Sequence, residues 1–232
     1  MVFLTGRIYK INPRNYSCIE KNFTEKGEKK YDEELYLVVE NVRENEYGFI
    51  SNVSIDFYKY IRTREKGQQR VVTYENGEIQ IYNKEPIEGF IAVFGKTDFQ
   101  RAVLDSVLKL CGRGALKFIV FDIDRKFDLL KQNFRDFRRI YVKKISGHLF
   151  LQDIALGGVR IELADELNRY TKRLGGRVTT IAFMFEGRWT LISSDGRIFS
   201  PSKYAYRFKT EILYKLLKKL IDLQLILYDK TL

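Results

Sequence analysis

The sequence predicts an α+β fold, in which a small antiparallel β domain (residues 1–88) precedes a mixed α/β domain (residues 89–232). The second domain is expected to contain an antiparallel meander and a long amphipathic C-terminal helix. The first 88 residues are rich in β-branched and aromatic runs, and helical periodicity begins only after residue 89. Helix-period segments then stand beside antiparallel runs instead of alternating regularly with strands, which favours α+β over a doubly wound sheet.

The N-terminal half is expected to be mostly strand. Strands are predicted at residues 2–11, 34–39 and 49–55. The polar residues 12–34 predict a long loop between the first two. Asn76-Gly77 lies between the alternating runs 70–74 and 78–82, and this pattern is typical of a tight hairpin. Residues 83–89, which contain Pro86, are the expected domain boundary.

The elements after residue 89 follow from changes in the hydrophobic period. Thr97 and Gln100 form the pattern of a capping box at the start of a helix that Gly112 would end. Buried strands are predicted at residues 90–94 and 116–123, and helices at 97–111, 124–137 and 163–174, the last of these ending at Gly175-Gly176.

The C-terminal third predicts a hairpin, a meander and a final helix. The hairpin would pair residues 139–142 with residues 149–151 around a turn at Ser146-Gly147, and the meander would use residues 178–185, 189–193 and 197–199. Ser200-Pro201 reads as the N-terminus of the last helix, which would extend to about residue 225. Its inward face is expected to be Leu213, Leu216, Leu217 and Leu220, with Arg207, Glu211, Lys215 and Lys219 facing solvent.

The positive charge is concentrated in the second half of the chain. Formal net charge is +11, from 41 Lys and Arg against 30 Asp and Glu. Residues 1–88 hold 14 basic and 15 acidic residues, whereas residues 89–232 hold 27 and 15. A one-sided basic distribution is typical of proteins that bind polyanions. The alternative interpretation is a highly charged surface of thermophile-like composition.

Cysteine and histidine are too few for a structural zinc site, which needs about four ligands. Cys18, Cys111 and His148 are the only such residues, and the two cysteines are expected to be small buried hydrophobes. No apolar run is long enough to span a bilayer, and the first residues lack the pattern of a signal peptide. A cytoplasmic protein without membrane association is therefore expected.

The candidate nucleic-acid contacts form two basic clusters. Helical spacing would place Lys131, Arg135 and Arg138 on one face and the interleaved phenylalanines in the core, so Tyr141 is the best candidate for base stacking. The second cluster would also complement a helix C-terminus. The candidates are Arg125, Lys126, Lys131, Arg135, Arg138, Arg139, Tyr141, Lys143, Lys144, Arg169, Lys172, Arg173 and Arg177.

Asp122 and Asp124, two residues apart after an apolar strand, are candidate metal ligands. The run resembles the first motif of the haloacid-dehalogenase family, in which case Ser193 or Ser194 and Lys203 would supply the later motifs. Lys126 stands where that family has Thr or Val, and no later acidic pair follows a strand, so membership is not predicted. Asp124 and Lys126 also fit the D-x-K of a restriction-like nuclease, with Asp98 or Asp105 as the partner acid. The simpler interpretation is that Asp124 caps the next helix.

These patterns rank three functions. The leading hypothesis is a non-catalytic protein that contacts nucleic-acid phosphates through residues 89–232 and needs no cofactor. Residues 1–88 would then form a homodimer or bind a protein partner. The first alternative is a nuclease or phosphohydrolase dependent on Mg²⁺ or Mn²⁺, with Asp122, Asp124 and Lys126 as catalytic residues. The second alternative is an assembly or scaffold protein whose basic charge is incidental. DNA and RNA, single- or double-stranded, all remain open.

Overall fold

The structure is a computed structural model that describes residues 3–64, 67–145, 152–201 and 210–231. Contacts between Cα atoms divide the chain into two compact units. The N-terminal unit contains residues 6–118 and 229–232, and the C-terminal unit contains residues 1–5 and 119–228. The expected boundary at residues 83–89 thus lies within the N-terminal unit, and independent folding of either half stays a prediction.

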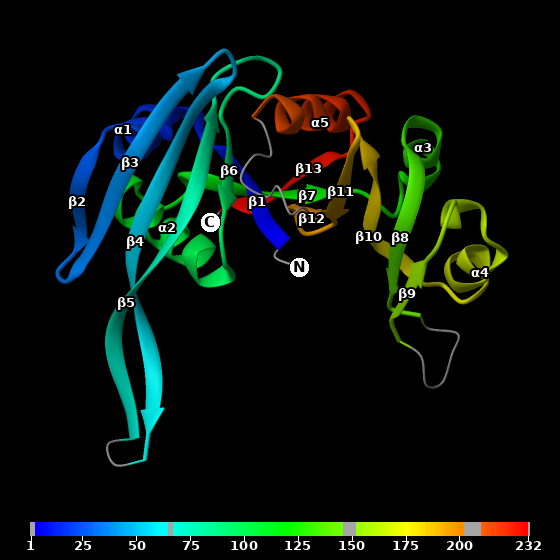
Figure 1. The fold of residues 1–232 in the computed structure, drawn as a ribbon, viewed down its shortest axis with the longest axis horizontal. Helices are drawn as coiled ribbons and strands as arrows, with labels where there is room; N and C mark the ends of the chain where they lie inside the picture. Colours follow the sequence, from blue (N-terminus) through cyan, green and yellow to red (C-terminus); the bar gives the residue numbers. More distant parts are fainter. Residues whose placement is uncertain (1–2, 65–66, 146–151, 202–209, 232) are drawn as a thin grey trace. The chain divides into compact units, whose positions relative to one another are not determined.

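The N-terminal unit is built on an antiparallel sheet with two longer helices, α1 (Tyr16–Thr24) and α2 (Thr97–Cys111) (Figure 1). The strands pair in the order β2-β3-β4-β5-β6-β1, and β7 also pairs with β1. A short 3₁₀ turn, Pro13–Asn15, precedes α1. The strands are β1 (Phe3–Ile11), β2 (Gly27–Asp32), β3 (Leu35–Asn45), β4 (Gly48–Thr63), β5 (Gly67–Tyr82), β6 (Phe90–Phe94) and β7 (Leu116–Phe121).

The core of this unit follows the two hydrophobic periods that the sequence displays. Every second residue of the central strands points inward, so that Val53, Ile55, Ile79 and Ile81 are fully buried. Helix α2 faces them with a stripe at i, i+4 and i+8, formed by Phe99, Val103 and Val107. The predicted strand 90–94 and helix 97–111 are confirmed, and Gly112 ends the helix with φ +87°.

Two predictions for this unit, the loop at residues 12–34 and the capping box at Thr97, are wrong. Residues 12–34 are not a loop, because they contain α1 and β2. Helix α1 carries only two buried residues, Ile19 and Phe23, and this pair is too short a pattern to indicate a helix. The capping box is also absent: Thr97 is already helical, and the Gln100 side chain donates to the Gly95 carbonyl at 3.0 Å.

The predicted hairpin at Asn76-Gly77 is wrong as well. Strand β5 passes straight through this dipeptide and pairs with β4 in unbroken register from Gly48 opposite Tyr82 to Thr63 opposite Gly67. Glycine is required at position 77 for another reason: a Cβ there would overlap the Phe99 ring and the Phe94 carbonyl oxygen. The glycine permits close approach of α2 and β6 instead of a turn.

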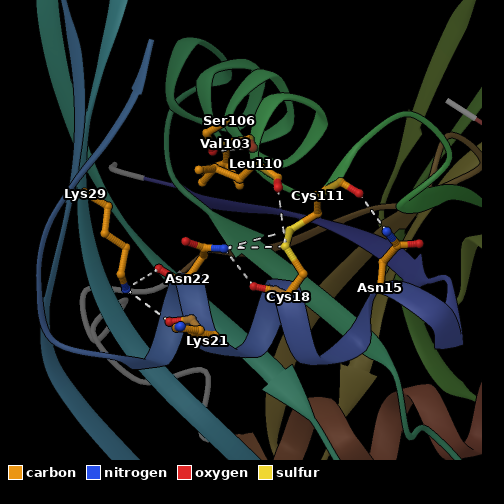
Figure 2. Close-up of a disulfide and its surroundings, with 9 residues drawn as sticks. All are labelled: Asn15, Cys18, Lys21, Asn22, Lys29, Val103, Ser106, Leu110 and Cys111. Carbon is orange, nitrogen blue, oxygen red and sulfur yellow. Dashed lines mark hydrogen bonds between the residues drawn. A yellow bond between two sulfur atoms is a disulfide. The ribbon is translucent and has the colours of Figure 1, made fainter.

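The two cysteines form a disulfide that links α1 to the last residue of α2 (Figure 2). Their Cα atoms are 5.8 Å apart, although 93 positions separate them in sequence. Asn22 donates to the Cys18 carbonyl at 2.9 Å, and Asn15 donates to the Cys111 carbonyl at 2.6 Å (Figure 2). The expectation of two separate buried thiols is therefore wrong.

The C-terminal unit contains five further strands of the same sheet, in the order β12-β11-β10-β8-β9, and these five strands are called the C-terminal sheet below. The predicted three-stranded meander is confirmed as β10, β11 and β12, joined by turns at Glu186-Gly187 and Gly196 in which φ is positive. The strands are β8 (Arg135–Lys143), β9 (Ile154–Gly157), β10 (Arg177–Phe185), β11 (Arg188–Ser193) and β12 (Arg197–Pro201). A further strand, β13 (Ile226–Thr231), follows the last helix.

The predicted helix over residues 124–137 is largely wrong. Helix α3 covers only Phe127–Asn133, and β8 begins two residues later. Phe134 and Phe137 fit a helical stripe equally well, but both pack against Phe183 of β10, with ring centroids 4.4 and 5.9 Å apart. The strand conformation of residues 135–143 is stabilised by the ladder with β10, which a local pattern does not reveal.

The other two helices predicted for this unit differ from the prediction in their type or in their bounds. Residues 161–173 form a 3₁₀ turn (Ile161–Leu163), a short helix α4 (Asp165–Asn168) and a π-helical turn (Arg169–Arg173). Pro201 belongs to β12 and does not start a helix. Helix α5 (Thr210–Asp222) buries the four leucines that the sequence places inward, and Lys215 pairs with Glu211 at 2.8 Å. The predictions for Ser146-Gly147, His148, Lys203 and Arg207 fall outside the described residues.

Candidate nucleic-acid interface

One face of the C-terminal sheet is buried and the other is open. Alternation along the strands sends Ile140, Ile181 and Ile192 to the buried face, where each is fully covered. The residues between them, among them Tyr141 and Leu191, are only partly buried. The described residues of this unit thus leave this face of the sheet partly accessible to a ligand.

Strand register arranges the open face into two rows across four strands. The first row is Tyr141, Thr180, Ser193 and Arg197, and each residue is directly opposite the next. The second row is Arg139, Ala182, Leu191 and Phe199, in the same strand order. The middle positions hold Thr180, Ser193, Ala182 and Leu191, and between them and the larger flanking side chains lies a hollow of about 530 Å³, called the trough below.

The flanks of the trough combine aromatic rings with cations. Tyr141 on β8 and Phe199 on β12 line opposite sides, and Arg139, Lys143 and Arg197 lie beside them. The Arg139 guanidinium donates to the Tyr141 hydroxyl at 3.4 Å, and the Arg197 guanidinium pairs with Asp195 at 2.9 Å. On the floor, the Thr180 hydroxyl donates to the Ser193 hydroxyl at 3.1 Å. Flat rings and positive charge therefore occur within one concavity.

A further aromatic–cation pair extends this face beyond the trough. The β8–β10 register shifts between Arg139 and Arg135, so Arg138 and Arg139 are both exposed instead of alternating. The Arg138 guanidinium lies 5.5 Å from the Trp189 ring centroid. This distance is within the range of a cation–π contact, which orients the guanidinium at the sheet surface.

A second hollow of about 350 Å³ brings the two basic clusters together. Arg125 and Lys131 from the first cluster line it with Lys172 and Arg177 from the second. The cations are partly balanced by acids, since Lys131 pairs with Asp128 at 2.6 Å. This hydrogen bond lowers the pKa of the Asp128 carboxyl below its ordinary value. The second hollow is therefore a mixed-charge surface, unlike the trough.

The candidate acids have structural roles in this unit. The Asp124 carboxylate accepts a hydrogen bond from the Val178 amide at 2.8 Å and so fixes the start of β10. Through its backbone, Asp122 accepts from the Lys126 amide at 3.3 Å and donates to the Leu225 carbonyl at 2.8 Å. Asp98 and Asp105 belong to the N-terminal unit. Among the described residues, no group of three or more His, Cys, Asp or Glu could hold a metal ion.

The structure thus divides the predicted contacts among several places. Arg139, Tyr141 and Lys143 line the trough, whereas Arg125, Lys131, Lys172 and Arg177 line the second hollow. Lys126 is half-buried before α3. The remaining predicted cations are exposed elsewhere on the unit, and they are Arg135, Arg138, Lys144, Arg169 and Arg173. Of these, Arg138 lies next to Trp189.

Sequence reasoning missed the contribution of the meander to the trough. Phe199, Arg197 and Leu191 lie in segments that the sequence correctly predicts as strands. Their alternation with Ile192 and Ile198 indicated which residues face away from the core. Tyr141 was expected in a strand, but its pairing with Thr180 of β10 joins segments that are distant in sequence and that no local pattern identifies.

No protein-family model matches the chain, and no curated protein matches it either. Within the part of the chain that the structure describes, no helix is long and apolar enough to cross a membrane. The function has to follow from the chemistry of these surfaces.

Proposed function

We propose that the protein binds single-stranded nucleic acid across the open face of its C-terminal sheet and catalyses no reaction on it. The observation that carries the proposal is the trough, in which Tyr141 and Phe199 lie on opposite sides of a floor containing Thr180 and Ser193, beside Arg139 and Lys143. Single strands expose base faces that stack on aromatic rings, and cations displace the counterions condensed on their phosphates.

The distribution of charge supports the same partner. Residues 89–232 carry a formal charge of +12, from 27 basic and 15 acidic residues. A duplex hides its base faces inside the stack, so the flanking aromatic rings favour a single strand over a double helix. The proposal covers RNA and DNA alike, because stacking and phosphate contact do not distinguish them.

The test is fluorescence anisotropy with labelled single strands of about 12 nucleotides, since sheet-based sites take about 4 to 16. Tyr141→Ala and Phe199→Ala are each expected to weaken binding by about 1–3 kcal/mol, or about 5- to 150-fold. Tyr141→Phe keeps the ring and should bind like the wild type. Tyr36→Ala removes an exposed ring from the N-terminal unit and is the matched control.

The contribution of the cations is measured separately through the salt dependence. The slope of log K against log salt is negative, and each lost phosphate contact on a single strand makes it shallower by about 0.7, so Arg139→Ala with Lys143→Ala should make it shallower by about 1.4. Unchanged affinity in both aromatic variants, or the same loss in Tyr36→Ala, refutes the proposal.

The other hypotheses stay predictions, and the same titrations address two of them. A nuclease would cleave the labelled strand only when Mg²⁺ or Mn²⁺ is added, and Asp122→Ala with Asp124→Ala would abolish cleavage. A scaffold protein would bind no strand at physiological salt. A homodimer or protein partner at residues 1–88 requires light scattering and pull-down experiments.

A cytoplasmic location also stays a prediction. Disulfides are rare in the cytosol of mesophiles but common in intracellular proteins of hyperthermophiles. The Cys18–Cys111 link and the thermophile-like composition are compatible in that setting.

A further inference from the structure

The paired strands β4 and β5 extend beyond the rest of the N-terminal sheet (Figure 1). Strand β3 pairs with β4 only as far as Ile55, and β6 pairs with β5 only from Glu78 onward. Beyond these points, residues 57–63 and 67–74 have ladder partners only in each other, as far as the described residues show. We call this segment the distal ribbon.

The base of the distal ribbon is fixed, and its outer part is exposed. Phe57 and Tyr58 pack against the core of the N-terminal unit. One face carries Tyr60 opposite Arg70 and Val72 opposite Tyr58, with Tyr74 next along β5. Tyr60 is 61% exposed and Tyr74 is 67% exposed, which is unusual for side chains of this size. Large exposed rings that share one face mark a surface that contacts a partner.

Charge indicates which partner fits this face. Residues 57–74 hold five basic residues and one acid, Glu65, a formal charge of +4. Two acids adjoin this segment, because Asp56 lies opposite Tyr74 and the Glu34 carboxylate lies 3.9 Å from the Arg70 guanidinium. Residues 1–88 as a whole carry −1, so the distal ribbon is a local basic extension of a near-neutral half. The Arg70 guanidinium lies 4.2 Å from the Tyr58 ring centroid, which holds it at the same face as the exposed rings. A second copy of the ribbon would bring like charges together, whereas a polyanion would neutralise them.

The dimensions favour one kind of polyanion. Paired strands lie about 4.8 Å apart, and seven residues per strand span roughly 23 Å. The major groove of B-form DNA is about 12 Å wide and admits a two-stranded ribbon, whereas the A-form major groove of double-stranded RNA is too narrow and deep. We propose that the distal ribbon lies in the major groove of double-stranded DNA. Arg62, Arg64 and Arg70 contact phosphates, and Tyr60 and Tyr74 contact base edges.

This site is separate from the trough, so each proposal can fail without the other. The experiment measures binding of the full chain to labelled duplex DNA, duplex RNA and single-stranded DNA over a salt series. The wild type is expected to prefer duplex DNA over duplex RNA. Removing Arg62, Arg64 and Arg70 together, each to Ala, should make the negative salt slope on duplex DNA shallower by about 2.7, since each contact contributes about 0.9.

A second variant tests the rings independently of charge. Tyr60→Ala with Tyr74→Ala should weaken duplex DNA binding at every salt concentration and leave the slope unchanged. The matched control removes three exposed cations of the same unit, Arg14, Lys21 and Lys26, each to Ala, and should keep the wild-type slope. Both ribbon variants should keep the far-ultraviolet circular dichroism of the wild type, which confirms that they are folded, and should retain its behaviour toward single-stranded DNA.

Three results would overturn the inference. In the first, neither ribbon variant changes the affinity for duplex DNA or the salt slope of that binding. In the second, the wild type binds duplex DNA and duplex RNA with equal affinity. The third is a wild-type dimer, detected by light scattering without nucleic acid, that Tyr60→Ala with Tyr74→Ala dissociates. That result would assign the ribbon to a second copy of the chain.

Discussion

Removing the disulfide should strongly destabilise the N-terminal unit. Cys18 and Cys111 close a loop of 93 positions, and a cross-link restricts the unfolded chain more as its loop becomes longer. The chain-entropy relation gives about 4.6 kcal/mol for this loop at 25 °C. Since domains of this size have unfolding free energies of about 5–15 kcal/mol, Cys18→Ser with Cys111→Ser should lose a large part of the stability.

The assay is urea unfolding followed by two probes. Trp189 is the only tryptophan, so its fluorescence reports the C-terminal unit, whereas far-ultraviolet circular dichroism reports both units. The midpoint of the dichroism transition should fall in the double variant, and the m-value should rise because an unlinked chain exposes more surface. A reductant should reproduce both effects in the wild type and change nothing in the double variant.

A small loss of stability in the double variant would refute this explanation. If the double variant unfolds within about 1 kcal/mol of the wild type, the cross-link does not restrict the unfolded chain as calculated. The Trp189 transition gives additional information. It stays unchanged if the two units unfold independently, and it moves with the dichroism transition if they unfold together.

Three further predictions follow from individual residues. Gly77→Ala should destabilise the N-terminal unit by about 1–3 kcal/mol in urea unfolding, because the added Cβ would overlap Phe99. In the control, Asn76→Ala at the exposed neighbouring residue should change the unfolding free energy by no more than about 0.5 kcal/mol. Equal effects of the two substitutions would contradict the packing explanation. Burial raises the pKa of the Glu78 carboxyl above its ordinary 4.5. Just above pH 4.5 the folded state therefore binds more protons than the unfolded state, and the wild type loses stability as the pH rises through that window. Glu78→Gln should therefore stabilise the protein at pH 7, with a gain that disappears toward pH 4.5, and a gain independent of pH would show another cause. Asp124→Ala should cost about 1 kcal/mol in the Trp189 transition, because the Val178 amide loses its acceptor at 2.8 Å. Asp153→Ala is the comparison that should cost less, because this exposed acid accepts a longer hydrogen bond, 3.4 Å, from the Lys144 amide.

Part of the candidate site was predictable from local sequence. Tyr141 was expected to be the best stacking residue, and it lies on the open face of the C-terminal sheet beside Arg139 and Lys143. The meander was also expected, because alternation with period two and glycine turns are short-range signals. What the sequence left open was which strands lie beside β8, and this pairing creates the trough.

Other features were beyond local patterns. The sequence placed Arg125 and Lys131 in one cluster and Lys172 and Arg177 in another, yet all four line one hollow. Asn76-Gly77 has the composition of a hairpin turn, but the position of the Phe99 ring explains its glycine. In both cases the deciding contacts join segments that are distant in sequence.

The sequence by itself determined the α+β class, the helix facing the N-terminal core, the meander and the concentration of positive charge after residue 89. Each of these depends on periodicity or composition within about 15 residues, which a single sequence contains. The tertiary structure alone decided the strand conformation of residues 135–137, the Cys18–Cys111 link and the extension of β4 and β5 beyond their neighbours. These features depend on which distant segments pair and pack, and ladder hydrogen bonds and buried contacts then override the local preference of the chain.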